Sequence, residues 1–199
     1  MPGASEFLIN GLYQGAALKG PAAPTGKIIL FADTGGYLAA VDEFGTESSL
    51  PAVVRSTATL TKTSDTTLQD VPGLFIHLNA GQAYKFEAWL FTTFTTSAGG
   101  WKVGLAADAT LSVTSMEVWG GAMTFTGASA LSIATRLSSL TSFGVTESTV
   151  SVTGARILVE GIIVVNAAGV LRIQFAQNNS SASPSAALAG SHITITPVD

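Results

Sequence analysis

The sequence contains no cysteine, and only 11% of its 199 residues are charged. Without cysteine the chain has neither disulfide bonds nor thiolate metal ligands. Ordinary soluble domains carry about 25% charged residues, so this chain has little charge with which to solubilise an apolar surface. Nine Lys and Arg stand against thirteen Asp and Glu, which gives a net charge of −4. The cations form no cluster, and nucleic-acid binding requires grouped cations, so we expect no nucleic-acid partner.

The sequence also has few of the residue patterns that indicate catalysis. The two histidines, His77 and His192, stand without a neighbouring carboxylate or hydroxyl motif, so we interpret both as structural or surface residues. The sequence has no nucleophile elbow, no His-x-x-x-His pair and no phosphate-binding glycine loop. We therefore expect no enzyme and no cofactor.

One acidic group resembles a cation site. It surrounds the Phe44-Gly45 turn and comprises Asp42, Glu43 and Glu47. Calcium takes several oxygen ligands, but the group lacks the spacing of a calcium-binding loop. We interpret it as a solvated turn and predict no metal site.

Targeting and membrane signals are missing as well. The N-terminal MPGASEF lacks a basic region followed by an apolar one. The most apolar window, residues 157–175, is interrupted by Glu160, Asn166 and Arg172. We expect neither a signal peptide nor a membrane span.

No segment combines helix caps with a long apolar stripe of period 3.6, whereas short apolar runs and turn glycines recur at spacings typical of an antiparallel sandwich. The predicted strands are Val54–Thr63, Gly73–Leu78, Ala83–Thr95, Trp101–Ala107, Thr110–Trp119, Ala122–Thr126, Val150–Val152, Arg156–Val165, Val170–Gln177 and His192–Pro197. Residues 129–143 fit a helix or a strand, and we favour a strand. Residues 178–190 are small and polar, which predicts a surface loop.

Residues 156–177 are the most informative stretch. Two apolar runs flank Asn-Ala-Ala-Gly, which predicts a β-hairpin. Alternation in the first run places Leu158 and Ile162 beside Arg156 and Glu160, so neither face of this strand is fully polar. Such a strand requires cover on both faces.

The mean hydropathy of +0.44 points in the same direction. With so few charges, burial of apolar surface between subunits is expected, and we predict an oligomer. Aromatic residues from Trp89 to Trp101 also permit a sugar-binding interpretation, but Trp89 and Phe91 share a mixed face with Lys85 and Glu87, which favours an interface. The predicted subunit interface comprises Trp89, Phe91, Arg156, Leu158, Glu160, Ile162 and Arg172.

Three regions follow along the chain. Residues 1–26 are rich in Pro and Gly and resist regular structure, residues 27–52 predict a β-hairpin module around Thr34-Gly35-Gly36, and residues 53–199 form the sandwich. The first region is more apolar than a solvated tail should be, so we interpret it as an arm that docks on a neighbouring protein or folds back on its own domain. Its candidate anchoring residues are Phe7, Leu8, Ile9, Leu12 and Tyr13.

Two sets of motifs resemble a known family. GKIILFADTGGYLAAVDEFGTESSL resembles the short β-module that precedes the head domain in many tailed-bacteriophage fibre and virion-surface proteins. LNAGQAYKFEAWLFTT, ARILVEGIIVVNAAGVLRIQFAQN and AGSHITITPV are similar to the trimeric jelly-roll heads of such proteins, which relate in shape to the tumour-necrosis-factor-like fold. The resemblance covers about residues 26–198. It implies an all-β, antiparallel jelly-roll sandwich and a homotrimer.

The resemblance also implies a role at the virion surface. We expect a homotrimeric capsid decoration or cement protein, assembled in the host cytoplasm, whose N-terminal arm binds the major capsid protein. The alternative is a tail-tip or short tail-fibre head that attaches to a tail protein and binds a host-surface glycan through its strand-connecting loops.

Overall fold

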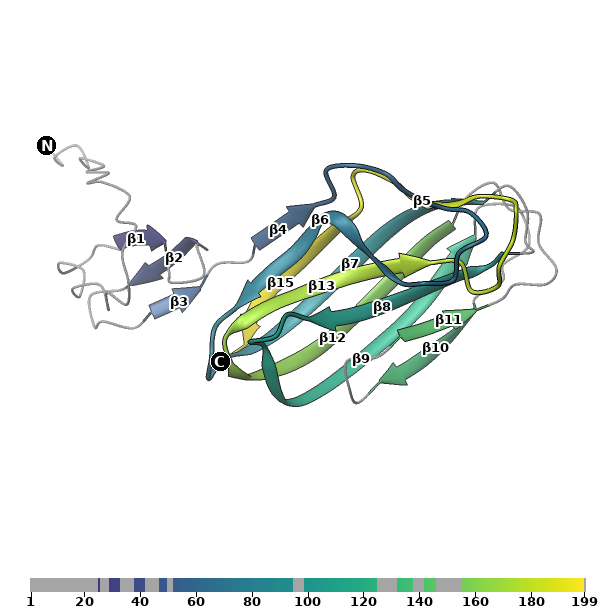
Figure 1. The fold of residues 1–199 in the computed structure, drawn as a ribbon. Coiled ribbons are helices and arrows are strands. Elements are labelled where there is room, and N and C mark those ends of the chain that lie inside the picture. The colour runs from purple at the N-terminus through teal and green to yellow at the C-terminus, as the bar shows by residue number, and fades with distance from the viewer. Residues whose placement is uncertain are drawn as a thin grey trace, which may run out of the picture. The chain divides into compact units, whose positions relative to one another are not determined.

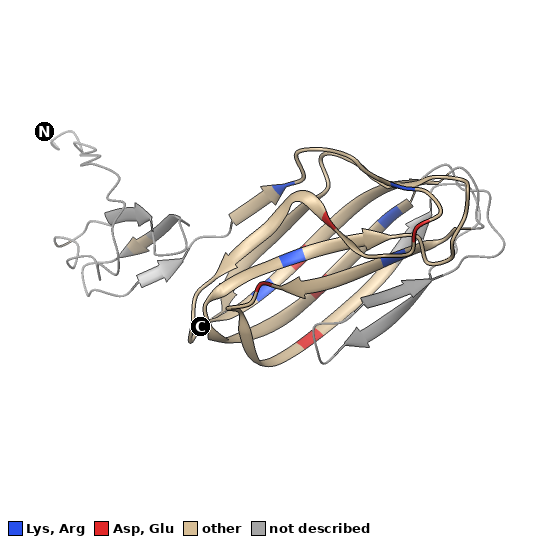
Figure 2. Ribbon diagram, viewed as in Figure 1, with Lys and Arg blue, Asp and Glu red and all other residues tan. Residues whose placement is uncertain are grey.

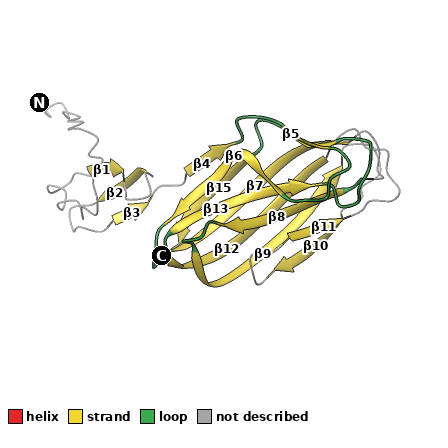
Figure 3. Ribbon diagram, viewed as in Figure 1, coloured by secondary structure: helices red, strands yellow, loops and turns green. Residues whose placement is uncertain are grey.

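The computed structural model describes residues 25, 29–32, 38–41, 47–49, 52–94, 99–124, 132–137, 142–145 and 155–198. Every regular element among them is a β-strand, and every strand pair is antiparallel (Figure 3). The prediction of an all-β antiparallel protein is therefore confirmed. The chain divides into two compact units, residues 1–50 and residues 51–199.

The first unit contains a three-stranded sheet of order β1-β2-β3 (Figure 1). Its strands are β1 (Ile29–Ala32), β2 (Leu38–Val41) and β3 (Glu47–Ser49). The first two form the expected hairpin, and β3 extends it by pairing with β2. The predicted anchoring residues Phe7, Leu8, Ile9, Leu12 and Tyr13 lie outside the described residues, as do Asp42 and Glu43.

The second unit is a sandwich of two sheets (Figure 1). The large sheet contains β4 (Ala52–Arg55), β5 (Leu60–Lys62), β7 (Ala83–Phe94), β9 (Ser112–Thr124), β10 (Ser132–Leu137), β12 (Ala155–Ala167), β14 (Ser185–Ala187) and β15 (His192–Val198). The four-stranded sheet, of order β11-β8-β13-β6, contains β6 (Gln69–Leu78), β8 (Trp101–Ala107), β11 (Ser142–Val145) and β13 (Gly169–Ala176).

The core lies between the two sheets because alternate side chains of each strand point inward. The twelve largest fully buried side chains come six from each sheet. The large sheet supplies Phe86, Leu90, Ile157, Ile163, Ile193 and Ile195, and the four-stranded sheet supplies Leu74, Ile76, Leu78, Leu171, Ile173 and Phe175. Each sheet therefore keeps one face for the core and one for the exterior.

The predicted hairpin of residues 156–177 is wrong. β12 pairs with β7 and β9 in the large sheet, whereas β13 pairs with β6 and β8 in the other sheet, so the chain crosses between sheets at Ala168. Gly169 permits this crossing, since a Cβ there would lie 2.4 Å from the Leu111 backbone nitrogen in the β8–β9 connection. That connection also crosses between the sheets, and its Asp108 N–H donates to Val170 O at 3.0 Å. This hydrogen bond continues the pairing of β13 with β8 into the β8–β9 connection.

Three further expectations need correction. The predicted strands Thr110–Trp119 and Ala122–Thr126 belong to one strand, β9, which continues through Gly120 and Gly121. Val54–Thr63 is divided between β4 and β5. The predicted loop at residues 178–190 contains β14, whose three residues are buried between β5 and β7. Small side chains fit this crowded position, and the segment is too short to show a periodic pattern. The ambiguous segment contains β10, as favoured.

The Gln177 side chain stabilises the loop that leads to β14 through hydrogen bonds. Its side chain is fully buried, its Oε1 accepts from the backbone N–H groups of Asp65 and Ser181 at 3.3 and 3.2 Å, and its Nε2 donates to Ser183 O at 2.7 Å. Leaving a buried hydrogen-bonding group without its partner costs about 1–3 kcal/mol. We expect Gln177→Leu to lower the unfolding free energy by about 3 kcal/mol, measured by urea denaturation.

The matched control is Gln174→Leu. Gln174 also donates a hydrogen bond, to Asp70 at 2.7 Å, but on the exposed surface. Surface substitutions of this kind change stability by about 0.5 kcal/mol or less. Equal losses in the two variants would contradict the role assigned to Gln177.

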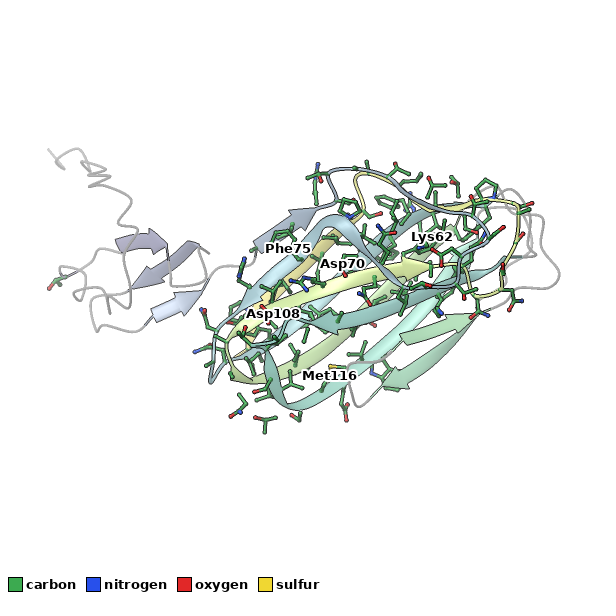
Figure 4. All side chains as sticks on the ribbon, viewed as in Figure 1. Lys62, Asp70, Phe75, Asp108 and Met116 are labelled. Atoms are coloured by element: carbon green, nitrogen blue, oxygen red, sulfur yellow. The ribbon has the colours of Figure 1, made fainter. Side chains whose placement is uncertain are left out.

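Two carboxylates, Asp65 and Asp108, stabilise connections between strands, and Asp108 is labelled in Figure 4. Asp65 forms an ion pair with the buried Lys62 and accepts from Thr67 N, and these contacts lower its pKa from 3.8 to about 2. Asp108 accepts from the backbone N–H of Leu111 at 2.8 Å and from Thr110, which lowers its pKa from 3.8 to about 2.

These lowered pKa values predict a loss of stability in acid. The folded state favours the ionised carboxylates, so their contribution is present above pH 3.8 and is lost as the pH falls toward 2. We expect the unfolding free energy to fall across this interval, and Asp65→Asn with Asp108→Asn to make the fall shallower. Urea denaturation at successive pH values measures both slopes. If the unfolding free energy of the wild type and of the double variant fell equally with pH, the assignment of the acid sensitivity to Asp65 and Asp108 would be contradicted.

Candidate functional site

The candidate site is the outer face of the large sheet, the face turned away from the core. On β12 this face carries Arg156, Leu158, Glu160 and Ile162, because the alternate residues Ile157, Val159 and Ile163 are buried. The register places Phe91, Trp89, Glu87 and Lys85 of β7 opposite those four β12 residues. On the other side of β12, Trp119 of β9 lies opposite Glu160, and Glu117 lies opposite Ile162.

Exposed apolar side chains gather on this face. Among the described residues five large apolar side chains are exposed, and four of them belong to the outer face of the large sheet. These four are Val53, Trp119, Ile162 and Val198. Trp119 is 46% exposed and Ile162 is 50% exposed, and they lie at diagonal positions of β9 and β12, because Trp119 is opposite Glu160 and Ile162 is opposite Glu117. Exposed apolar side chains that lie next to one another can mark an interaction surface, and Trp119 and Ile162 form such a pair on this face.

The aromatic residues of the face are held by polar neighbours. Trp89 Nε1–H donates to Glu87 Oε1 at 2.6 Å. The Arg156 guanidinium lies 5.4 Å from the centre of the Phe91 ring, and the His192 ring lies 5.8 Å from the same centre. These contacts fix the orientation of the rings before any partner binds, which reduces the entropic cost of binding.

Charges on this face are arranged unevenly. Glu160 and Glu87 lie directly opposite one another on adjacent strands, an arrangement that is destabilising for like charges. Lys85 and Arg156 lie on the two sides of this pair along the strands. Figure 2 shows charged residues on both sheets, and on the four-stranded sheet Arg172 pairs with Asp70. The acidic pair and the nearby cations form the main electrostatic feature of the outer face of the large sheet.

The structure brings together six of the seven residues predicted for the interface. Trp89, Phe91, Arg156, Leu158, Glu160 and Ile162 share the outer face of the large sheet. Arg172 lies on β13 of the other sheet, where its Nε is 3.6 Å from Asp70 Oδ2. Whether the six residues contact another subunit remains a prediction.

Burial excludes part of the sugar-binding interpretation. Phe94 and Trp101 are 6% and 3% exposed and belong to the core, so neither can stack on a ligand. Sequence reasoning missed Trp119, Val53 and Val198. The alternation of Trp119 with the apolar Val118 indicates that Trp119 points to the outer face of its strand. Only the pairing of β9 with β12 shows that this face is the one that carries Glu160 and Ile162.

The acidic residues and histidines of the described part of the chain have the following surroundings. No group of three or more His, Asp or Glu side chains there is arranged to hold a metal ion. His77 lies edge-on to Phe75, with ring centres 5.9 Å apart, and His192 packs on Phe91, so each histidine has an aromatic neighbour. Within the same residues, no helix has the length and apolar character needed to cross a bilayer.

Comparisons with known proteins give little more. No protein-family model and no curated protein matches the chain. Among solved structures, the chain is similar to that of the infectious bursal disease virus Gx strain, with 12% identity, a TM-score of 0.20, and coverage of 80% of this chain and 41% of that one. It is also similar to the VP2 subviral particle of the same virus, with 13% identity, a TM-score of 0.19, and coverage of 80% and 42%. The chain thus spans about two fifths of the length of these structures, and TM-scores this low carry no argument about function.

Proposed function

We propose that this chain is a structural protein of a virus particle that acts as a homotrimer and works by adhesion rather than by catalysis. The observation that carries the proposal is the outer face of the large sheet, on which Trp119 and Ile162 are exposed at diagonal positions and Trp89 lies opposite Leu158. Burying a large apolar side chain contributes about 1.5–3 kcal/mol, so this face supplies enough driving force for association once ordering costs are met.

The charges of the face suit an interface between copies. Glu160 and Glu87 lie opposite one another, and Lys85 and Arg156 lie on the same surface. When copies close around a threefold axis, one part of this face lies against a different part of the next copy, so a cation of one copy can meet the acidic pair of the next and offset the repulsion. The same surface thus supplies both halves of a complementary contact.

The number of copies and the virus type rest on the sequence resemblance. Trimeric jelly-roll heads of tailed-bacteriophage surface proteins share the turn and strand patterns of residues 26–198. We place the protein on the capsid exterior as a decoration or cement protein, with Phe7, Leu8, Ile9, Leu12 and Tyr13 as the apolar contacts of the arm with the major capsid protein. Three arms on one trimer bind together, so weak individual contacts give firm attachment.

Light scattering coupled to gel filtration tests the assembly. The expected mass is about 61 kDa, three times the 20.3 kDa of the chain, since closed rings are the usual form of such oligomers. A monomer at micromolar concentration would overturn the proposed assembly.

Electron microscopy of the particle with the protein labelled tests the location of the protein. Density on the capsid exterior supports the decoration role, whereas density at the tail tip supports the glycan-binding tail protein that is the alternative.

Removing residues 1–20 separates attachment from assembly. We expect the truncated protein to keep its trimer mass, because the predicted interface lies in residues 89–172, and to lose binding to capsids that lack the native protein. Co-sedimentation with such capsids measures the loss. Capsid binding that is unchanged by the truncation would contradict the role of the arm, whatever the oligomeric state.

A further inference from the structure

A second exposed aromatic residue lies on the opposite side of the sandwich. Phe75 is 44% exposed and is the one exposed large apolar side chain of the described residues that the large sheet does not carry. It belongs to β6, on the outer face of the four-stranded sheet (Figure 4). The His77 ring lies edge-on to the Phe75 ring at an interplanar angle of 82°. The proposed self-association through the large sheet leaves this face without an assigned role.

Planar polar groups lie on the same face as Phe75. Arg172 of β13 lies directly opposite Phe75, and Gln174 lies opposite Asp70. Gln174 Nε2 donates to Asp70 Oδ1 at 2.7 Å, and Arg172 Nε lies 3.6 Å from Asp70 Oδ2. The Arg172 and Asp70 side chains remain 38% and 48% exposed. A carboxylate, a guanidinium and an amide are therefore held in fixed positions beside an open ring.

An irregularity in β6 creates this cluster. Asp70 and Phe75 are five residues apart, an odd spacing that would place them on opposite faces of a regular strand. The register shows that two residues along β13, from Arg172 to Gln174, correspond to these five along β6. Gly73, with a φ of +75°, lies within the irregular stretch, where a left-handed backbone favours glycine. The bulge brings Asp70 and Phe75 to the same face, and bulges of this kind often position functional side chains.

We propose that Phe75, Asp70, Arg172 and Gln174 form a binding site for a neutral hexopyranose. A pyranose ring presents an apolar C–H face that can lie on Phe75, as binding sites generally combine aromatic walls with a few placed polar groups. Its hydroxyl groups can donate to Asp70 and accept from Arg172 and Gln174. The Asp70 and Arg172 charges cancel, so the site favours an uncharged sugar over an anionic one.

Ligand-observed NMR with galactose, glucose, mannose and N-acetylglucosamine tests the site on the full chain. We expect at least one of these sugars to bind in the millimolar range, and Phe75→Ala to weaken its affinity about tenfold or more. Asp70→Ala should weaken binding similarly, whereas Phe75→Trp should preserve it. Because Phe75 and Asp70 are exposed, these variants should keep the wild-type melting temperature.

The matched control is Trp119→Ala, which removes a similarly exposed aromatic residue from the other sheet and should leave sugar affinity unchanged. N-acetylneuraminic acid, an anionic sugar, should bind less well than the best neutral one. The proposal is overturned if none of the four neutral sugars binds at a sugar concentration of about 50 mM, which is well above the expected dissociation constant of a few millimolar. It is also overturned if Phe75→Ala binds as well as the wild type, or if the anionic sugar binds best. None of these results bears on the mass of the oligomer.

Discussion

Replacing Trp119 and Ile162 together by serine should convert the trimer into a monomer. The two side chains are the most exposed large apolar groups on β9 and β12, and they lie at neighbouring positions of the paired strands. Losing the burial of two such side chains removes about 4 kcal/mol from each contact between copies, which weakens association roughly a thousandfold. In a closed trimer every subunit takes part in two contacts, so the effect on the whole assembly is larger still.

Light scattering over a range of protein concentrations measures this change. The matched control is Phe75→Ser, because Phe75 and Trp119 are 44% and 46% exposed but lie on opposite sheets. We expect the control to keep the mass of the wild type. A double variant that keeps the wild-type mass, or a control that dissociates equally, would refute the assignment of the large sheet to self-association.

Gly161→Ala should cause a large loss of folding stability. Gly161 lies on β12 opposite Val118 of β9 and Phe86 of β7. A Cβ at this position would lie 2.3 Å from the carbonyl oxygen of Glu117 and 2.9 Å from Val118 Cγ2. A backbone carbonyl in the middle of a sheet cannot move without breaking the pairing of β9 with β12. We expect a loss of about 3 kcal/mol or more, at the upper end of the cost of overpacking.

Calorimetry measures this loss as a fall in melting temperature of roughly 6–12 °C, since about 2–4 °C corresponds to 1 kcal/mol at this chain length. Gly81→Ala provides the comparison. Gly81 has a φ of +77° and no atom within 4 Å of the added methyl group, so its cost is that of a left-handed alanine, about 1–2 kcal/mol. Equal falls in melting temperature for Gly161→Ala and Gly81→Ala would contradict the prediction, because they would show that the sheet accommodates the added methyl group at Gly161.

Local sequence patterns predicted the strands better than their partners. Alternation in residues 156–165 placed Arg156, Leu158, Glu160 and Ile162 on one face, and the structure has them there. The hairpin prediction failed because an Asn-Ala-Ala-Gly turn looks alike whether the next strand returns to the same sheet or crosses to the other. Contacts with the β8–β9 connection, 60 residues away in sequence, decide between them, and no local pattern contains that information.

The residues of the outer face differ in how far a local pattern indicates their position. Trp89 and Phe91 lie on a strand of mixed polarity, and both lie on the outer face. The place of Trp119 depends on β9 lying beside β12, which no local pattern contains. Arg172 and Arg156 have similar apolar neighbours in the sequence, although they belong to different sheets.

The sequence alone determined that this protein is all-β and antiparallel, because period-two alternation and turn glycines are properties of short segments. It also determined that one face of β12 would carry both apolar and charged side chains. The tertiary structure alone decided which strands share a sheet, and hence which exposed side chains meet: Trp119 with Ile162 on one side, and Phe75 with Asp70 and Arg172 on the other. The reason is physical, since pairing between strands distant in sequence depends on packing across the whole core, to which each segment contributes only a part.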